Sequence, residues 1–342
     1  MNDTTSLPEN ATIISTDGLS KRFGKLVAVN NLNLQVIRGD VFGFLGPNGS
    51  GKTTTIRMLL GLIRPTTGRA YMFGMDNTYQ LPTILQRTGA IVETPTFYTY
   101  LSGRDNLSVI AAASGMDAGK ATDRRIAEVL EIVDLHTYGK LVYRKYSLGM
   151  KQRLGIAAAL LADPELVMLD EPTNGLDPAG VVEIRQFIQR LSLLGKTIFI
   201  SSHILSEIQQ VCNRVAIMQK GHLIQQGRVD ELLRHNEQIE VRFSQEDETL
   251  SAQNVLLQAQ SQGSDWIRGV RIERSRQNQS WLLIEAPIAQ TDEINALLMR
   301  QNLFAVELHP REGSLEEIFL QLTSTPPSML QQPRSALVSK IK

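Results

Sequence analysis

A glycine-rich segment at residues 46–54 constrains the fold of this chain more than any other feature. It reads Gly-Pro-Asn-Gly-Ser-Gly-Lys-Thr-Thr, directly after the apolar run Val41–Leu45 and directly before an apolar-periodic stretch at 56–63. A strand, a glycine-rich loop and a helix in this order form a phosphate-binding loop, in which backbone N–H groups surround a phosphate. Glycines permit the close backbone approach, and the helix N-terminus adds partial positive charge. The segment predicts a nucleotide-binding protein of the P-loop class; a chance glycine-rich turn is the alternative.

The loop residues have separate expected roles. Lys52 would reach the β- and γ-phosphates, and the Thr53 hydroxyl would take a place on Mg²⁺. The full set expected to contact the nucleotide is Gly46, Asn48, Gly49, Ser50, Gly51, Lys52, Thr53 and Thr54.

Three later segments decide which kind of P-loop protein this is, because the fold hosts many activities. Each places polar residues beside an apolar run or a helical pattern: Tyr-Ser-Leu-Gly-Met-Lys-Gln-Arg at 146–153, Asp170 and Glu171 after the run 166–169, and Ser201, Ser202 and His203 after the strand 197–200. In this order they resemble the ATP-binding cassette (ABC) family, over about residues 12–230. The resemblance implies an ATPase that uses ATP and Mg²⁺, similar to the ATPases of bacitracin-type and related antibiotic exporters.

The carboxylates and the histidine give the expected chemistry. Asp170 ends an apolar strand, where a carboxylate can hold Mg²⁺ directly or through water. Glu171 is placed to polarise the attacking water. His203 is expected to sense or stabilise the γ-phosphate. The predicted catalytic residues are therefore Glu171, His203 and Lys52, and the alternatives are a solvated Asp-Glu loop and a structural histidine.

Ser147 and Gly149 keep two positions of the family signature Leu-Ser-Gly-Gly-Gln. A hydroxyl and an open backbone N–H at a helix N-terminus can bind a phosphate. The resemblance implies that they contact the ATP held by the other cassette of a head-to-tail dimer. It also implies that the loop 174–177, which ends in Asp177, crosses the dimer interface; a simple turn capped before Pro178 is the alternative.

Two further positions depend on the resemblance alone. Phe23 occupies the place of an aromatic that stacks on adenine, the alternative being a buried Phe in a small sheet. Glu93 stands where the family usually carries Gln, in a loop that contacts the membrane subunit and Mg²⁺ or its water. A carboxylate can still accept a hydrogen bond from water, but it adds negative charge beside the metal. We interpret Glu93 as a coupling residue. The expected metal-side residues are Thr53, Asp170 and Glu93.

The chain is long enough for two domains, with 342 residues of which 42% are apolar. Helical patterns dominate residues 103–162, which we interpret as a helical insert, at about 94–162, on an α/β core with a mostly parallel sheet. The order strand, helix, strand, strand, helix, strand at 235–312 is ferredoxin-like. We expect a flexible leader at 1–11, a cassette at 12–234, a small α+β domain at 235–322 and a disordered tail at 323–342.

Composition excludes several classes of partner and compartment. Lys and Arg number 35 against 35 Asp and Glu, which gives no basic footprint for nucleic acid. The single cysteine, Cys212, has a core-like helical spacing and can form no disulfide within the chain. No run approaches the roughly 18 apolar residues of a membrane span, and the polar N-terminus lacks a secretory signal. We expect a cytoplasmic protein on the inner face of the plasma membrane, in contact with the membrane only through separate transmembrane permease subunits.

Two rival functions stay open at this point. A soluble ABC ATPase of translation or repair is disfavoured, because only one P-loop is present and the 95 positions between Lys52 and Ser147 leave no room for a long coiled coil. A degenerate cassette that binds ATP without hydrolysis is disfavoured because Lys52, Asp170, Glu171 and His203 are all present.

Overall fold

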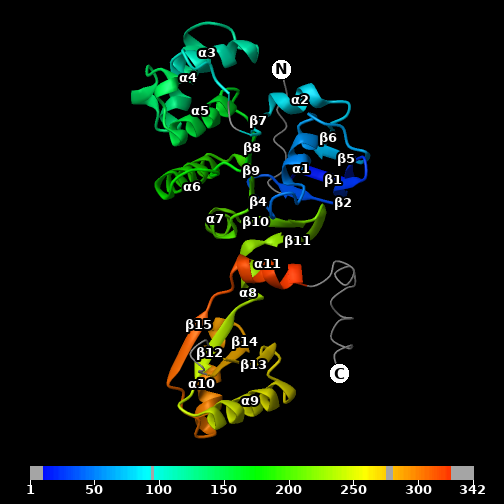
Figure 1. Cartoon of the computed structure of the whole chain (residues 1–342), viewed down its shortest axis with the longest axis vertical. Helices are drawn as coiled ribbons and strands as arrows, with labels where there is room; N and C mark the ends of the chain where they lie inside the picture. The colour runs from blue at the N-terminus through cyan, green and yellow to red at the C-terminus, as the bar shows by residue number, and fades with distance from the viewer. Residues whose placement is uncertain (1–10, 94–95, 275–279, 325–342) are drawn as a thin grey trace. The chain divides into compact units, whose positions relative to one another are not determined.

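The computed structural model describes residues 11–93, 96–274 and 280–324, whose helices and strands are shown in Figure 1. The chain divides into two compact units, Met1–Gly227 and Arg228–Lys342, and each is described by itself. The expected leader, apart from Ala11, and the expected tail from residue 325 onward lie outside the described residues.

A six-stranded sheet forms the centre of the first unit, in the order β11-β10-β4-β9-β8-β7. Neighbouring strands from β10 to β7 run parallel. Every residue of β4, β8 and β9 is buried, as parallel strands covered on both faces require. The strands are β4 (Val41–Leu45), β7 (Thr88–Ile91), β8 (Leu166–Asp170), β9 (Thr197–Ser202), β10 (Arg214–Gln219) and β11 (His222–Arg228).

A second, antiparallel sheet has the order β2-β1-β5-β6, with β3 also paired to β1. Its strands are β1 (Thr12–Phe23), β2 (Leu26–Leu32), β3 (Gln35–Ile37), β5 (Thr67–Met72) and β6 (Met75–Asp76). One hydrophobic core combines buried residues of this sheet, of α1 (Lys52–Leu59) and of the six-stranded sheet. The helix that follows the P-loop is thus anchored against both sheets.

One expected strand is divided in two. The alternation of Leu32, Leu34 and Val36 predicts a single strand, whereas β2 ends at Leu32 and β3 begins at Gln35. All three apolar side chains are nevertheless buried, while Asn33 and Gln35 are exposed. The alternating pattern therefore predicts correctly which side chains are buried, even though the strand is interrupted.

The helices of the first unit fall into two groups, those of the helical insert and those outside it. The helical insert contains α3 (Gly103–Ala113), α4 (Lys120–Ile132) and α5 (Leu148–Leu160), which contact one another, and α5 also contacts β7. Outside the insert lie α2 (Leu81–Gln86), α6 (Pro178–Leu193), which contacts β9, and α7 (Leu205–Val211), which contacts β4.

Cys212 follows α7 and is buried, and this burial raises the pKa of its thiol. The structure therefore confirms the core role expected for Cys212.

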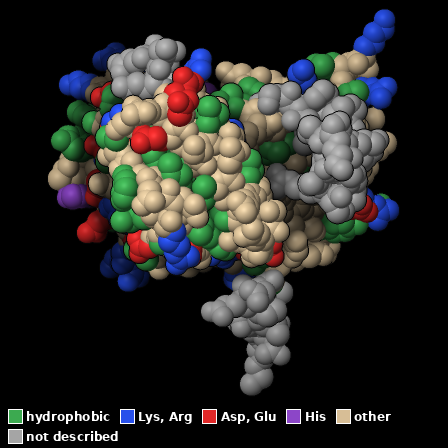
Figure 2. All heavy atoms as spheres, turned by 90° about the horizontal axis from the view of Figure 1, so that it is seen from below, with side chains coloured by type: hydrophobic (Ala, Val, Ile, Leu, Met, Phe, Trp, Pro, Cys, Tyr) green, Lys and Arg blue, Asp and Glu red, His purple; other side chains and the backbone are tan. Residues whose placement is uncertain are grey.

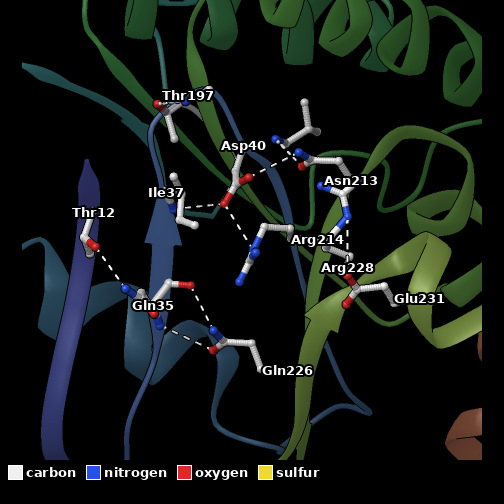
Figure 3. A network of polar contacts seen from close by, with 12 residues as sticks. Thr12, Gln35, Ile37, Asp40, Thr197, Asn213, Arg214, Gln226, Arg228 and Glu231 are labelled. Atoms are coloured by element: carbon white, nitrogen blue, oxygen red, sulfur yellow. Dashed lines mark hydrogen bonds and ion pairs between the residues drawn. The ribbon is translucent and has the colours of Figure 1, made fainter. Parts of the chain in front are cut away.

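Polar side chains close the end of the six-stranded sheet at which β4 begins (Figure 3). The carboxylate of buried Asp40 accepts from the Ile37 amide at 2.9 Å and from Asn213 Nδ2 at 3.2 Å. Nearby, the Gln226 side-chain amide accepts from the Gln35 N–H at 3.3 Å and donates to the Gln35 carbonyl at 3.0 Å. Gln226 therefore makes to Gln35 the two hydrogen bonds that a neighbouring strand would make.

The second unit is built on a four-stranded antiparallel sheet in the order β13-β14-β12-β15. Its strands are β12 (Gln238–Arg242), β13 (Gly269–Arg274), β14 (Ser280–Glu285) and β15 (Glu307–Arg311), with α9 (Glu246–Ser261) and α10 (Thr291–Arg300) between them. This chain order and sheet order are those of the ferredoxin-like arrangement. A separate core, with Val241, Leu256 and Leu298 among its members, fills the space between sheet and helices.

Figure 2 looks onto the end of this unit that carries α9 and α10, where uncharged side chains fill much of the middle. Residues of α9 after Glu248 include no charged side chain, and Leu250 and Leu257 are exposed. Ser314 caps α11 (Leu315–Ser324) by accepting from the Glu317 amide at 3.1 Å.

The two units meet in sequence at Gly227, whereas the sequence pattern predicts that the cassette ends at residue 234. The difference is the short helix α8 (Val229–Arg234). This helix contacts α11 from the end of the chain, so it belongs to the second unit. Its partner is about 80 residues away, beyond the range of any local pattern.

Candidate functional site

The P-loop joins β4 to α1 and is held in a conformation that needs glycine. Gly49 and Gly51 have φ angles of 78° and 108°, in the left-handed region. A Cβ on Gly51 would lie 2.5 Å from the Ala28 carbonyl oxygen, and one on Gly46 would lie 2.4 Å from the Met218 carbonyl oxygen. Packing thus requires glycine at Gly46 and Gly51, and the dihedral angle favours it at Gly49 and Gly51.

The loop presents polar atoms that have no hydrogen-bond partner in the described part of the chain. Among the described residues, no hydrogen-bond acceptor is found for the backbone N–H groups of Gly49, Gly51, Lys52, Thr53 and Thr54. The buried Ser50 hydroxyl likewise has no partner in the described part of the chain. Free donors at the N-terminus of a helix are what a phosphate group requires, so the loop fits a nucleotide phosphate.

Lys52, Glu171 and His203 form one cluster beside the loop. Lys52 Nζ, in a side chain that is 5% exposed, donates to the Gly46 carbonyl at 2.6 Å and lies 3.1 Å from Glu171 Oε1. The other oxygen of the same carboxylate, Oε2, lies 2.7 Å from His203 Nδ1. The structure thus brings together all three residues that the sequence predicts to be catalytic.

Asp170 lies next to this cluster and is buried. It ends β8, in register with Ser201 of β9. The Ser201 hydroxyl donates to Asp170 Oδ1, and the Glu171 amide donates to that hydroxyl at 2.9 Å. Glu171 itself has a left-handed φ of 50°. The chain therefore turns sharply between the two carboxylates and sends their side chains to different partners.

The donor set also fits a magnesium ion that accompanies a nucleotide. No three His, Cys, Asp or Glu side chains gather as a metal cluster in the described ranges. A P-loop metal site does not need such a cluster, because a loop Ser or Thr, one strand-end Asp and the phosphate oxygens suffice. Thr53 at the start of α1 and Asp170 at the end of β8 are the two protein groups that would hold the magnesium ion.

Ser147, Gly149 and Asp177 line a different pocket, between the start of α5 and the start of α6. Ser147 caps α5 by accepting from the Met150 amide at 3.2 Å. Asp177 caps α6 by accepting from the Gly180 amide at 2.8 Å. The simple capped turn, the alternative interpretation of this loop, is therefore part of its structure within one chain.

Phe23 ends β1 with 48% of its surface exposed, and Lys21 Nζ lies 5.0 Å from the ring centre. This exposure excludes the alternative of a buried core phenylalanine.

Glu93 is ion-paired with Arg57 of α1, and the Glu93 side chain is 65% exposed. Glu93 has a left-handed φ of 70°. In the described part of the chain it makes no hydrogen bond or ion pair with Lys52, Asp170 or Glu171.

Ser201 and Arg57 were not assigned roles from the sequence. The usable signal for Ser201 is a hydroxyl directly after the apolar strand 197–200. Arg57 carries no signal of its own, because its partner is 36 positions away.

Comparisons with known proteins agree with this geometry. The family described as ABC transporter matches residues 29–174. The chain is 42% identical to the bacitracin transport ATP-binding protein BcrA of Bacillus licheniformis, over 91% of this chain and 97% of that protein. It is 38% identical to the protein of the same name from Enterococcus faecalis, over 91% and 96% of the two chains.

Similarity to solved structures covers about two thirds of the chain. The structure of cbiO1 from Clostridium perfringens, part of an ABC transporter complex, matches with a TM-score of 0.60 and 28% identity, over 65% of this chain and 90% of that one. None of the helices among the described residues has both the length and the apolar character of a membrane span.

Proposed function

The chain belongs to the ABC transporter family, and from this we propose that it is the ATP-hydrolysing subunit of an exporter for an antibiotic-type compound. The observation that carries the proposal is the cluster of Lys52, Glu171 and His203 beside a P-loop with free amide donors. The similarity to bacitracin transport ATP-binding proteins over nine tenths of the chain supports the cargo class. A translation or repair ATPase is not favoured, because these relatives are transport proteins.

Each catalytic residue has a role in this proposal. The free amides of the loop bind the β- and γ-phosphates, and Lys52 neutralises their charge. Glu171 accepts a proton from the attacking water, and His203 contacts the γ-phosphate. The Glu171 carboxylate lies between Lys52 and His203. Phosphate binding therefore competes for both of its partners, which ties the orientation of the base to the presence of nucleotide.

Magnesium, when bound, neutralises charge that develops on the transferred phosphate. Thr53 and Asp170 are the residues that would hold it. We include Glu93 as a residue that acts between this centre and the permease, because its family position is usually Gln and its carboxylate already has a cationic partner in Arg57.

We infer that two copies of the chain act together. The pocket with Ser147 and Gly149 presents a helix N-terminus in a group of residues distinct from those around Lys52. Such a helix end favours an anion, so it would complete the ATP site of a second copy, with the Asp177 loop at the contact. Separate permease subunits would use the closing and opening of this dimer, which keeps any membrane contact of the chain indirect.

The first test is Glu171→Gln. Removing the general base lowers phosphate release by about 10²- to 10⁴-fold. ATP binding is retained, and ATP converts the protein to a dimer that sedimentation velocity detects. Glu128→Gln on α4, where the side chain is 58% exposed, is the matched carboxylate control and leaves turnover unchanged.

The same variant tests the transporter assignment. Tagged Glu171→Gln protein with ATP is incubated with detergent-solubilised membranes of its host, and the ATP-dependent partners are identified. Recovery of a multi-span membrane protein supports the proposal. Recovery of soluble partners or ribosomes alone contradicts it, as does a wild-type protein that releases no phosphate from ATP.

A further inference from the structure

We propose that Ser201 is a positioning residue for hydrolysis, whose buried hydroxyl fixes the Asp170 carboxylate and the backbone of Glu171 relative to each other. This inference rests on the proposed ATPase function. Ser201 is 0% exposed and lies opposite Asp170 in the β8–β9 pair. The Ser201 hydroxyl contacts both Asp170 and Glu171. No other side chain of the described site contacts both of these residues.

The hydrogen bonds of the hydroxyl have defined directions. A serine hydroxyl has one hydrogen to donate and two lone pairs to accept with. The hydrogen goes to Asp170 Oδ1, and one lone pair accepts from the Glu171 N–H at 2.9 Å. One oxygen of the Asp170 carboxylate is thereby occupied, which fixes the orientation in which the other can face a metal ion.

The contact to Glu171 supports an unusual backbone. Glu171 has a φ of 50°, a conformation that non-glycine residues keep only when the surroundings determine it strongly. Its amide donates to Ser201 twice, to the hydroxyl and to the carbonyl oxygen at 3.2 Å. The left-handed turn directs the Glu171 side chain away from Asp170 and towards Lys52 and His203. Loss of the hydroxyl would loosen both carboxylates.

The adjacent residue shows that burial alone does not produce this arrangement. Ser202 is also buried, at 2% exposure, yet among the described residues its hydroxyl bonds only to the backbone of Ile204, at 3.0 Å to the amide and 3.4 Å to the carbonyl. Two neighbouring buried serines thus have different partners, and Ser202 is a control of the same type in the same strand.

The experiment compares Ser201→Ala, Ser201→Thr and Ser202→Ala in the full chain. Mn²⁺ affinity of the protein with saturating ADP is measured by electron paramagnetic resonance, and kcat and KM are measured with Mg²⁺ and ATP. Residues that orient metal ligands typically affect metal affinity by about 10- to 100-fold. Ser201→Ala should lower Mn²⁺ affinity and kcat by about tenfold, with KM for ATP and metal-free ADP affinity unchanged. Ser201→Thr retains the hydroxyl and should recover most of the loss, and Ser202→Ala should match the wild type.

Several results would overturn the proposal. They are unchanged Mn²⁺ affinity and kcat in Ser201→Ala, an equal loss in Ser202→Ala, and loss of metal-free ADP binding in Ser201→Ala, which would show a role in folding. These results can be told apart from failure of the proposed function, because they leave wild-type turnover and its dependence on Glu171 in place.

Discussion

Glu93 places a negative charge in the loop after β7, and Arg57 supplies the opposite charge from α1. Both side chains are substantially exposed, at 65% and 39%. Exposed pairs contribute about 0.2–1 kcal/mol to stability. Stability alone therefore gives little reason for the pair. It joins the P-loop helix to the loop that we propose to contact the permease, which supports a role in coupling.

We predict that Glu93→Gln changes the number of ATP molecules used per transport event while the free energy of unfolding changes by less than about 1 kcal/mol. The reason is that the substitution removes the charge that Arg57 holds but keeps the shape of the side chain. Transport and phosphate release are measured together in reconstituted vesicles. Arg57→Gln added to Glu93→Gln should have no further effect, since double mutants reveal shared function. An unchanged ratio in Glu93→Gln contradicts the coupling role.

Phe23→Ala should weaken ATP binding by about tenfold, because stacking on a base contributes roughly 1–3 kcal/mol. Fluorescent nucleotide titration measures this change. Phe23→Trp keeps the ring and should retain affinity, and inorganic triphosphate, which has no base, should bind both variants equally. Because the ring is already 48% exposed, the melting temperature should not fall. Equal weakening for triphosphate would show that Phe23 does not stack on adenine.

The residues of the site differ in how far sequence could identify them. The P-loop and the Asp170–Glu171 pair are local patterns whose spacing carries the chemistry. Ser201 and Arg57 acquire their partners only through folding, from β8 and from the loop after β7. The Asp177 loop was predicted as an interface element, and its capping of α6 is a second, structural use of the same carboxylate.

At the scale of elements, Glu165 ties together the ends of three strands. It precedes β8 and accepts from Arg38, after β3, at 2.6 Å and from Arg87, before β7, at 2.5 Å. The Arg87 guanidinium also lies 4.0 Å from the centre of the Phe73 ring. The hydrogen bond from Arg87, together with Arg38, lowers the pKa of Glu165 below its usual value near 4.5.

The contacts of Glu165 with Arg38 and Arg87 predict that the stability of the fold depends on pH. A carboxylate whose pKa is lower in the folded state stabilises the fold above its unfolded pKa, and this stabilisation is lost as the pH falls through the folded pKa. Glu165→Gln should therefore cost about 1 kcal/mol at pH 7, since the carboxylate is partly exposed to solvent. The difference from wild type should disappear as the pH falls below about 4.5, as measured by urea unfolding at several pH values. A difference that is constant with pH would contradict this account.

Local periodicity predicted most elements, because buried parallel strands and amphipathic helices have clear patterns. It did not predict the gap between β2 and β3, since burial continues through the gap. It also could not assign α8 to the second unit, because that depends on contact with α11.

At the scale of the whole molecule, two cores share no residue, one around α1 and one between α9, α10 and the four-stranded sheet. We predict that the Glu171→Gln protein unfolds in two denaturant transitions. Mg·ATP should move only the transition of the unit that binds it. Ligand at 100 times its Kd stabilises the unit that binds it by about 2.7 kcal/mol. Tryptophan fluorescence reports the second unit, because both tryptophans, Trp266 and Trp281, belong to it.

A core substitution assigns the transitions. Leu256→Ala, at a fully buried position of the second core, should lower only the transition that ATP does not move, by about 2–5 kcal/mol. A single transition that shifts with both ATP and Leu256→Ala would show that the two units unfold together.

The hydrogen bonds between Gln226 and Gln35 have a consequence for self-association. A strand with an open edge offers its N–H and C=O groups to other chains and is a common starting point for aggregation. At β3 the Gln35 groups are occupied by a side chain of the same molecule, at 3.3 and 3.0 Å. A protein proposed to meet a second copy of itself at its nucleotide sites thus has one fewer surface on which two copies could pair by mistake.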